Sequence, residues 1–240
     1  MWVLVVVSRY IRELEIYSSH YEKKQNILPS SLYTCKSLVI LKLDGGILLD
    51  VPRMVCLPSF KTLELKSVRY FNQGSLQQLL SKCPVLEDLL VALNYPEKLG
   101  KSITHVKRLQ ISSKAMFGDG FICSHLEHLT LHVLEEYASN LLAWFLKDSP
   151  NLRELVYFSE LDDNYENLCM FPWNQPSTVP ECLLLSLQKF TWTEYLGRPQ
   201  DRDIAVYILK NACRLRTATI DSYTCLVPEL EMIKELTSSS

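Results

Sequence analysis

Three histidines near the middle of the chain are the residues best suited to bind a metal ion. His125, His128 and His132 lie close together, and Cys123 precedes them. If this segment is a strand, His128 and His132 share a face but lie roughly 13 Å apart, at about 3.3 Å per residue. One zinc ion bound at about 2.1 Å by each ligand cannot span that separation. We therefore expect no metal site here and predict that the histidines belong to a surface that faces a partner.

The sequence also shows no set of residues that would form a catalytic site. Asp162 and Asp163 are adjacent carboxylates, but no neighbouring element would form a pocket around them, so a solvated loop explains them better. Asp44-Gly45-Gly46 lacks the lysine and the helix that a phosphate-binding loop requires, and it predicts a turn between a strand and a loop. No Gly-x-Ser-x-Gly or His-Glu-x-x-His motif occurs. We expect no catalytic residue and no cofactor, and hence no enzyme.

The elements that position these side chains come from an internal repeat. The pattern apolar-x-x-apolar-x-apolar returns along the whole chain, with starts separated by 20 to 35 residues. Most of these separations fall in or near the window of about 20 to 29 residues that is typical of leucine-rich repeats. The copies begin at Ile11, Leu38, Phe60, Leu86, Val106, Leu126, Leu152, Leu187 and Leu215.

Each copy predicts one short strand, because its last two apolar residues alternate with a third residue between them. Segments of helical period lie between several copies and supply the return path that parallel strands need. Three such faces are clear: Leu76, Leu79, Leu80 and Cys83; Leu134, Ala138, Leu141, Leu142 and Phe145; and Ala205, Ile208, Leu209 and Ala212. The sequence therefore predicts an α/β fold, a leucine-rich-repeat solenoid with a parallel inner β-sheet and outer helices or loops.

Cysteine spacing and charge limit the chemistry and the partners. No Cys-x-x-Cys pair occurs, and Cys35, Cys83 and Cys123 each lie three residues before a leucine that opens a repeat, which indicates a structural position and a reducing compartment. The net charge of -2 gives no basic surface for nucleic acid. The apolar start, Met1 to Val7, is too short to span a membrane and lacks the features of a signal peptide. We expect a cytoplasmic or nuclear protein that binds neither nucleic acid nor membranes.

A family resemblance rests on several quoted segments. The C-terminal ones are Val179-Pro180-Glu181-Cys182-Leu183, Ser186-Leu187-Gln188-Lys189-Phe190-Thr191-Trp192, Ala205-Val206-Tyr207-Ile208-Leu209-Lys210-Asn211-Ala212 and Leu215-Arg216-Thr217-Ala218-Thr219-Ile220. Earlier ones are Cys35-Lys36-Ser37-Leu38-Val39-Ile40-Leu41-Lys42-Leu43, Leu57-Pro58-Ser59-Phe60-Lys61-Thr62-Leu63 and Cys83-Pro84-Val85-Leu86-Glu87-Asp88-Leu89. Together they resemble the plant F-box/LRR family that carries a C-terminal FBD domain.

The resemblance implies a function in protein recognition. Proteins of this family are thought to be substrate receptors of SCF ubiquitin ligases, in which the F-box docks on a Skp adaptor and the repeats hold the target. Here Trp2-Val3 resembles the segment just before the first repeat, so we expect the F-box itself to be absent. After residues 229–236 we also expect the closing strand of the family to be absent. Binding to a Skp adaptor and cullin is therefore not expected, and the alternative is a truncated family member with no current activity.

The same pattern divides the chain into segments. We predict leucine-rich repeats over residues 1–158, an acidic and proline-containing loop over 159–178, FBD-like units over 179–236 and a tail over 237–240. The loop is equally consistent with a functional segment and with a linker.

The partner is predicted to be an unknown target protein that binds the inner sheet. In each strand the residue between the two core positions faces away from the core. These residues, with neighbours two positions on, would form one stripe, and Leu90, Val156 and Phe158 would add apolar area to it. The predicted partner-binding residues are Glu15, Lys42, Glu64, Leu90, Gln110, Thr130, His132, Val156 and Phe158, and Thr191 and Thr219 continue the stripe.

Overall fold

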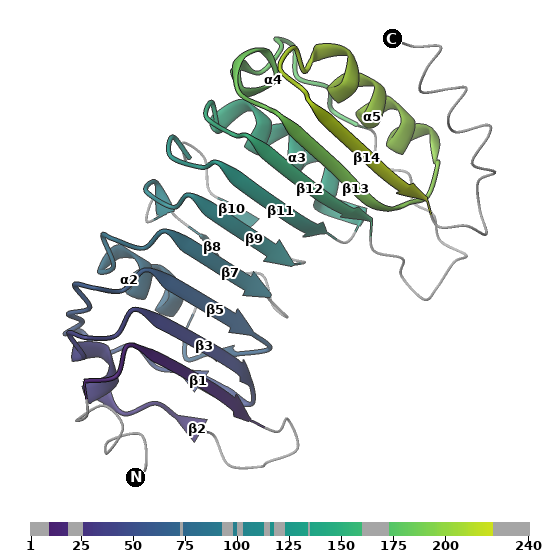
Figure 1. Ribbon diagram of the computed structural model, residues 1–240. Coiled ribbons are helices and arrows are strands. Elements are labelled where there is room, and N and C mark those ends of the chain that lie inside the picture. Colours follow the sequence, from purple (N-terminus) through teal and green to yellow (C-terminus); the bar gives the residue numbers. More distant parts are fainter. Residues whose placement is uncertain are drawn as a thin grey trace. The chain divides into compact units, whose positions relative to one another are not determined.

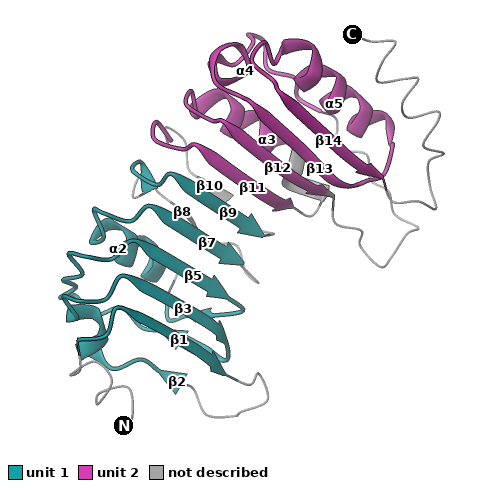
Figure 2. Ribbon diagram, in the orientation of Figure 1, with its two compact units in different colours: residues 1–122 teal, residues 123–240 magenta. Residues whose placement is uncertain are grey.

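A computed structural model describes most of the chain. The described residues are 10–18, 26–72, 74–92, 98–99, 103–112, 116–117, 123–133, 135–159 and 173–222. Two compact units divide the chain, residues 1–122 and residues 123–240 (Figure 2). Asp162, Asp163 and Leu134 lie outside the described residues, as do most of the predicted 159–178 loop and both ends of the chain.

Parallel strands in sequence order form the main sheet of unit 1 (Figure 1). They are β1 (Glu13–Ser18), β3 (Ile40–Gly45), β5 (Thr62–Lys66), β7 (Asp88–Ala92) and β9 (Arg108–Ser112). Register aligns the core positions into two rows, one of Leu14, Leu41, Leu63, Leu89 and Leu109 and one of Ile16, Leu43, Leu65, Val91 and Ile111. All of the first row is buried. The leucine spacing thus produces the predicted parallel solenoid sheet, because each repeat places the same two side chains at the same height.

The return segments of unit 1 are mostly short strands. They are β2 (Asn26–Ile27), β4 (Ile47–Leu49) and β6 (Arg69–Tyr70), which form a second parallel sheet, and β8 (Lys98–Leu99) paired with β10 (Met116–Phe117). A 3-10 helix, η1 (Ser30–Thr34), and the predicted helix α2 (Ser75–Ser81) complete the unit. The sequence suggested a loop after Asp44-Gly45-Gly46, but β4 follows there and is buried along its whole length. A strand buried on both faces has no alternation of apolar and polar residues, so its pattern gave no signal.

Helices provide the return path in unit 2. Its strands run parallel in the order β11 (His128–Val133), β12 (Glu154–Ser159), β13 (Lys189–Tyr195) and β14 (Thr217–Ser222). Between them lie the predicted helices α3 (Glu135–Asp148) and α5 (Pro199–Asn211), and a short unpredicted helix, α4 (Glu181–Leu185). In the view of Figure 1, α3 lies behind the strands. The register rows that continue the core positions are Leu129, Leu155, Phe190 and Ala218, and Leu131, Tyr157, Trp192 and Ile220. All are buried except those of β14, where Ala218 is exposed and Ile220 is half-buried.

One turn recurs before the strands of both units. A buried residue accepts, at its carbonyl, the N–H of the apolar residue three positions on, with N···O distances between 3.0 and 3.3 Å. The accepting residues are Cys35, Leu57, Cys83, Ile103, Cys123, Ser149 and Ala212. Burial raises the pKa of the thiols of Cys83 and Cys123 to about 12, so both stay protonated and unreactive at neutral pH. The cysteines therefore occupy the recurrent structural position that their spacing indicated.

Candidate protein-binding face

The predicted stripe residues lie on one face of each sheet. In unit 1, Glu15, Lys42, Glu64, Leu90 and Gln110 align in register across the strands β1 to β9. All five are partly or fully exposed, whereas the core positions on either side of the last four are buried. We call this row, with the residues two positions before and after it, the unit 1 face. The structure thus brings together the predicted binding residues of unit 1.

The predicted stripe residues of unit 2 also align in register on one face of its sheet. Thr130, Val156, Thr191 and Thr219 form one register row, and the next row begins with His132, Phe158 and Thr193. These residues are half-buried, except for the exposed Thr219. Neighbouring parallel strands lie about 4.8 Å apart, so adjacent members of a row can contact the same ligand. We call these two rows the unit 2 face. One stripe that continues across both units stays a prediction.

The charges of the unit 1 face are paired with one another. Lys42 contacts both Glu15 and Glu13, at 3.4 Å in the latter pair, and Lys66 lies 2.5 Å from Glu64. The hydrogen bond from Lys42 lowers the pKa of Glu15, and the same contact raises the pKa of Lys42. Opposite charges therefore neutralise each other along this face, and exposed pairs of this kind add little to stability.

The unit 2 face has a different, largely uncharged centre. The rings of His132 and Phe158 stack with centroids 3.8 Å apart and an angle of 14° between their planes. Burial lowers the pKa of His132, so its imidazole is neutral at pH 7. Val156 and two threonines, Thr130 and Thr191, make up the row beside the stack. This centre offers aromatic and apolar surface with hydroxyl groups around it.

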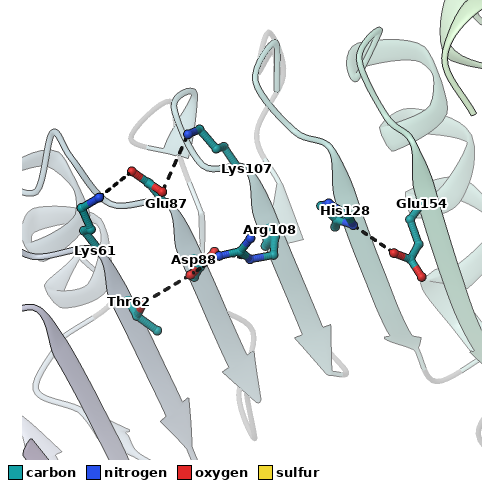
Figure 3. Close-up of polar contacts among 8 residues, drawn as sticks. All are labelled: Lys61, Thr62, Glu87, Asp88, Lys107, Arg108, His128 and Glu154. Carbon is teal, nitrogen blue, oxygen red and sulfur yellow. Dashed lines mark hydrogen bonds and ion pairs between the residues drawn. The ribbon is translucent and has the colours of Figure 1, made fainter. Parts of the chain in front are cut away.

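Charged residues also form pairs where the strands of unit 1 begin. Lys61 and Lys107 lie 3.1 and 3.7 Å from Glu87, which lies between them on the neighbouring repeat (Figure 3). One residue further on, Arg108 lies 2.6 Å from Asp88, and the Thr62 hydroxyl donates to the same carboxylate at 3.3 Å. The pairs join residues about one repeat apart, so they favour the correct register between repeats.

A corresponding set begins the strands of unit 2. Glu154 lies 2.6 Å from the ammonium of Lys189 and 3.0 Å from Nδ1 of His128. The hydrogen bond from Lys189, and then that from His128, lowers the pKa of Glu154. Sequence reasoning missed these contacts. The signal was present, because the dipeptides Glu87-Asp88 and Lys107-Arg108 occupy the same position in successive repeats and have opposite charge.

The histidines do not converge on one point. His128 contacts Glu154, His132 stacks on Phe158, and His125 contacts the hydroxyl of Ser124. Within the part of the chain that the structure describes, no group of three or more His, Cys, Asp or Glu residues is placed to hold a metal ion. Within the same part, no helix has both the length and the apolar character needed to cross a membrane.

Comparison with known protein families matches two successive segments of the chain. A model of FBD-associated F-box protein LRR repeats, named for At5g56370, matches residues 1–171, and the FBD model matches residues 175–220. The FBD match lies entirely in unit 2 and includes α4, β13 and α5. No solved structure matches the chain significantly.

Relatives in Arabidopsis thaliana match nearly the whole chain. FBD-associated F-box protein At4g10400 is 58% identical, over 100% of this chain and 75% of the relative. FBD-associated F-box protein At5g38590 is 40% identical over 98% and 75%, and putative F-box/FBD/LRR-repeat protein At5g62970 is 34% identical over 98% and 70%.

The rows of leucine on parallel strands, one strand per repeat, define a leucine-rich-repeat protein. Within that class, the chain belongs to the plant family of F-box proteins that combine such repeats with an FBD domain.

This chain is shorter than its relatives inside the matched region. The alignment with At4g10400 has 308 positions for the 240 residues of this chain, so at least 68 of its positions have no residue here. Repeats of about 20 to 29 residues make this the length of roughly two to three repeats. A solenoid tolerates such a difference because each repeat contacts only its neighbours.

Proposed function

We propose that this chain is a non-catalytic module that recognises a target protein through the open faces of its sheets, as the target-recognition part of an SCF ubiquitin-ligase receptor. The observation that carries the proposal is the partly exposed register rows, which are held at fixed spacing by buried core rows on the same strands. A rigid array of side chains without a catalytic group suits binding better than chemistry. The cytoplasm or the nucleus is the proposed compartment.

The receptor role draws support from the names of the relatives, which describe F-box proteins. A receptor needs one surface for the ligase and another for the target, and the repeats of this chain would provide the second. The proposed target contacts are Glu15, Lys42, Glu64, Leu90 and Gln110 in unit 1, together with those of the unit 2 face.

A co-purification experiment tests the proposal. The tagged full chain would be expressed in plant cells, and its partners identified by mass spectrometry beside two variants, Leu90→Ser on the unit 1 face and Val156→Ser on the unit 2 face. Leu185→Ser is a matched control, because Leu185 is 61% exposed on α4 and lies outside both faces. We expect a partner that the wild-type chain and the control retain and that at least one face variant loses.

Two outcomes separate the parts of the proposal. A partner that is retained by both face variants, while their melting temperatures match the wild type, contradicts target binding at these faces. Recovery of the target with a Skp adaptor and cullin would contradict the expectation that this chain does not bind them and would support a ligase role. Recovery of the target alone supports a chain that binds without delivering.

A second candidate is a family member without current activity. It is favoured by the 68 or more alignment positions that this chain lacks. A purified chain that melts without cooperativity, or that is not monomeric, would support this candidate. The buried core rows of both units support the first candidate, because such rows predict cooperative unfolding.

A further inference from the structure

We infer that the unit 2 face binds an uncharged, extended segment of the target that places an aromatic or branched apolar side chain against Phe158 and Val156. This inference deepens the proposed function and rests on it. It assigns the chemistry of the bound segment, which the repeat pattern and the family do not specify.

The first argument is the rigidity of the platform. His132 and Phe158 occupy the same register position on β11 and β12, and their stacked rings hold each other in place. Beneath them the core residues Leu131 and Tyr157 are buried, and Tyr157 packs edge to face on Trp192, with centroids 4.8 Å apart. A preorganised aromatic surface loses little side-chain entropy when a partner binds.

The second argument is the cost of removing water. Glu154, two residues before Val156 on β12, is already paired with Lys189 and His128 at the start of the strands. The neighbours of Val156 and Phe158 in these rows, Thr130, Thr191 and Thr193, carry no charge. An apolar side chain that docks here displaces water without stranding a charge, which would otherwise be expensive.

The third argument, that the bound segment is extended, comes from the threonine hydroxyls of this face. These hydroxyls can donate or accept hydrogen bonds, so they can pair with the backbone N–H and C=O groups of a ligand. A partner segment that runs across the strands would meet threonine hydroxyls in both rows, while one of its side chains covers Phe158. Charged ligand residues would gain no counter-charge at this centre.

The charges of the unit 1 face make that face a less favourable site for an uncharged segment. On β1, β3 and β5 its equivalent rows carry Lys42 with Glu15, and Lys66 with Glu64. An apolar segment that docks there would cover these ion pairs and would have to remove their water. Unit 2 is therefore the favourable site for an uncharged segment.

The test selects ligands for the full chain from a random dodecapeptide library displayed on phage, at pH 7.5. Selected peptides are then synthesised with a fluorescein label, and their affinity is measured by anisotropy. We expect an aromatic or branched apolar residue in each selected peptide and no net charge. Phe158→Ala and Val156→Ser should weaken binding about tenfold or more, as expected for central contacts of an interface.

Two controls keep the result specific. Leu185→Ser, at an exposed position on α4 outside both faces, should leave the affinity within about twofold. Affinity should also stay within about twofold between about 50 and about 500 mM salt, because an uncharged contact is not screened. Should Phe158→Ala unfold the chain, Phe158→Leu retains the apolar volume while removing the stacked ring, and a loss of affinity is expected there too.

The inference and the proposed function fail in different ways. The inference is overturned if the selected peptides are acidic or basic, or if their binding is sensitive to salt. It is also overturned if binding responds to Lys42→Ala and not to Phe158→Ala. These results would still allow target binding at unit 1. A folded chain that selects no peptide also overturns it, whereas the proposed function is judged on the partner recovered from cells.

Discussion

The two units use one strand frame with different return segments and different cores. Unit 1 returns mainly through short strands such as β4 and β6, while unit 2 returns through helices such as α3 and α5. The core rows of unit 1 are aliphatic, and those of unit 2 include Tyr157, Phe190 and Trp192. The difference shows that register depends on the leucine-type positions of each strand, and that the outer segment has only to cover them.

The open faces differ as well, and this difference separates binding from stability. Ion pairs neutralise the unit 1 face, whereas the centre of the unit 2 face is uncharged. Since core positions alternate with face positions along each strand, the binding chemistry can change while the core rows stay the same. Four substitutions test how far the two units differ.

The largest effect is expected from Trp192→Ala in unit 2. Trp192 is fully buried and packs edge to face against Tyr157 and Tyr195, with centroids 4.8 and 5.1 Å apart. Loss of such a side chain costs about 3 to 5 kcal/mol of unfolding free energy. Leu65→Ala, at an equally buried core position of unit 1, is the matched change. We expect it to cost less than Trp192→Ala because its side chain is smaller, within a range of about 2 to 5 kcal/mol.

Urea unfolding measures both costs, and hydrogen exchange of proteolytic fragments assigns them to a unit. An equal or smaller loss for Trp192→Ala would mean that the aromatic core of unit 2 is no more important to it than the aliphatic core is to unit 1.

Gly45→Ala is expected to destabilise unit 1 by about 2 to 3 kcal/mol. Gly45 ends β3 with φ +97°, and a Cβ there would overlap the backbone oxygen of Ser18 on the neighbouring strand. Gly74→Ala is the control, because Gly74 has φ -108° and its Cβ would meet only the side-chain oxygen of Asn72 at 3.4 Å. Hydrogen exchange should rise in β1 and β3 for the first variant alone, and equal effects of the two would contradict the strain at Gly45.

Asp201→Ala tests how strongly unit 2 depends on its helices. Asp201 is 3% exposed in the first turn of α5, where it accepts hydrogen bonds from the N–H of Arg198 at 3.2 Å and from its guanidinium at 3.0 and 3.1 Å. Removal of this cap should cost about 1 to 2 kcal/mol. Asp203→Ala, an exposed neighbour on the same helix, should change stability by less than about 0.5 kcal/mol. Thermal melting compares the two, and similar melting temperatures would rule out a stabilising cap.

The smallest effect concerns pH and the strand-start pairs of unit 2. Because the pKa of Glu154 is lowered in the folded chain, its stabilising contribution is present above its ordinary pKa of 4.5 and disappears as the pH falls through the folded value. Glu154→Gln should therefore flatten the loss of stability between about pH 5 and pH 3, by less than about 1 kcal/mol since the pair is partly exposed. Urea titrations at several pH values measure the slope, and an unchanged slope would remove Glu154 from the acid response.

Much of the fold could be predicted from the sequence because it follows from local spacing. Core positions such as Leu41 and Leu63 repeat within a six-residue frame, and a strand with that frame can bury them on only one face. Helical periodicity likewise predicted α2, α3 and α5, and the alternation within each strand placed Lys42 and Val156 on the open face.

Only the tertiary structure decided which side chains of different repeats meet. The stack of His132 on Phe158 joins residues 26 positions apart, and so does the pairing of Lys61 with Glu87. These contacts depend on the length of each return segment, which the strand pattern leaves free. The buried strand β4 and the short helix α4 were missed for a related reason. Each is too short to show a period, and its conformation is stabilised by the residues packed around it, which the local sequence does not contain.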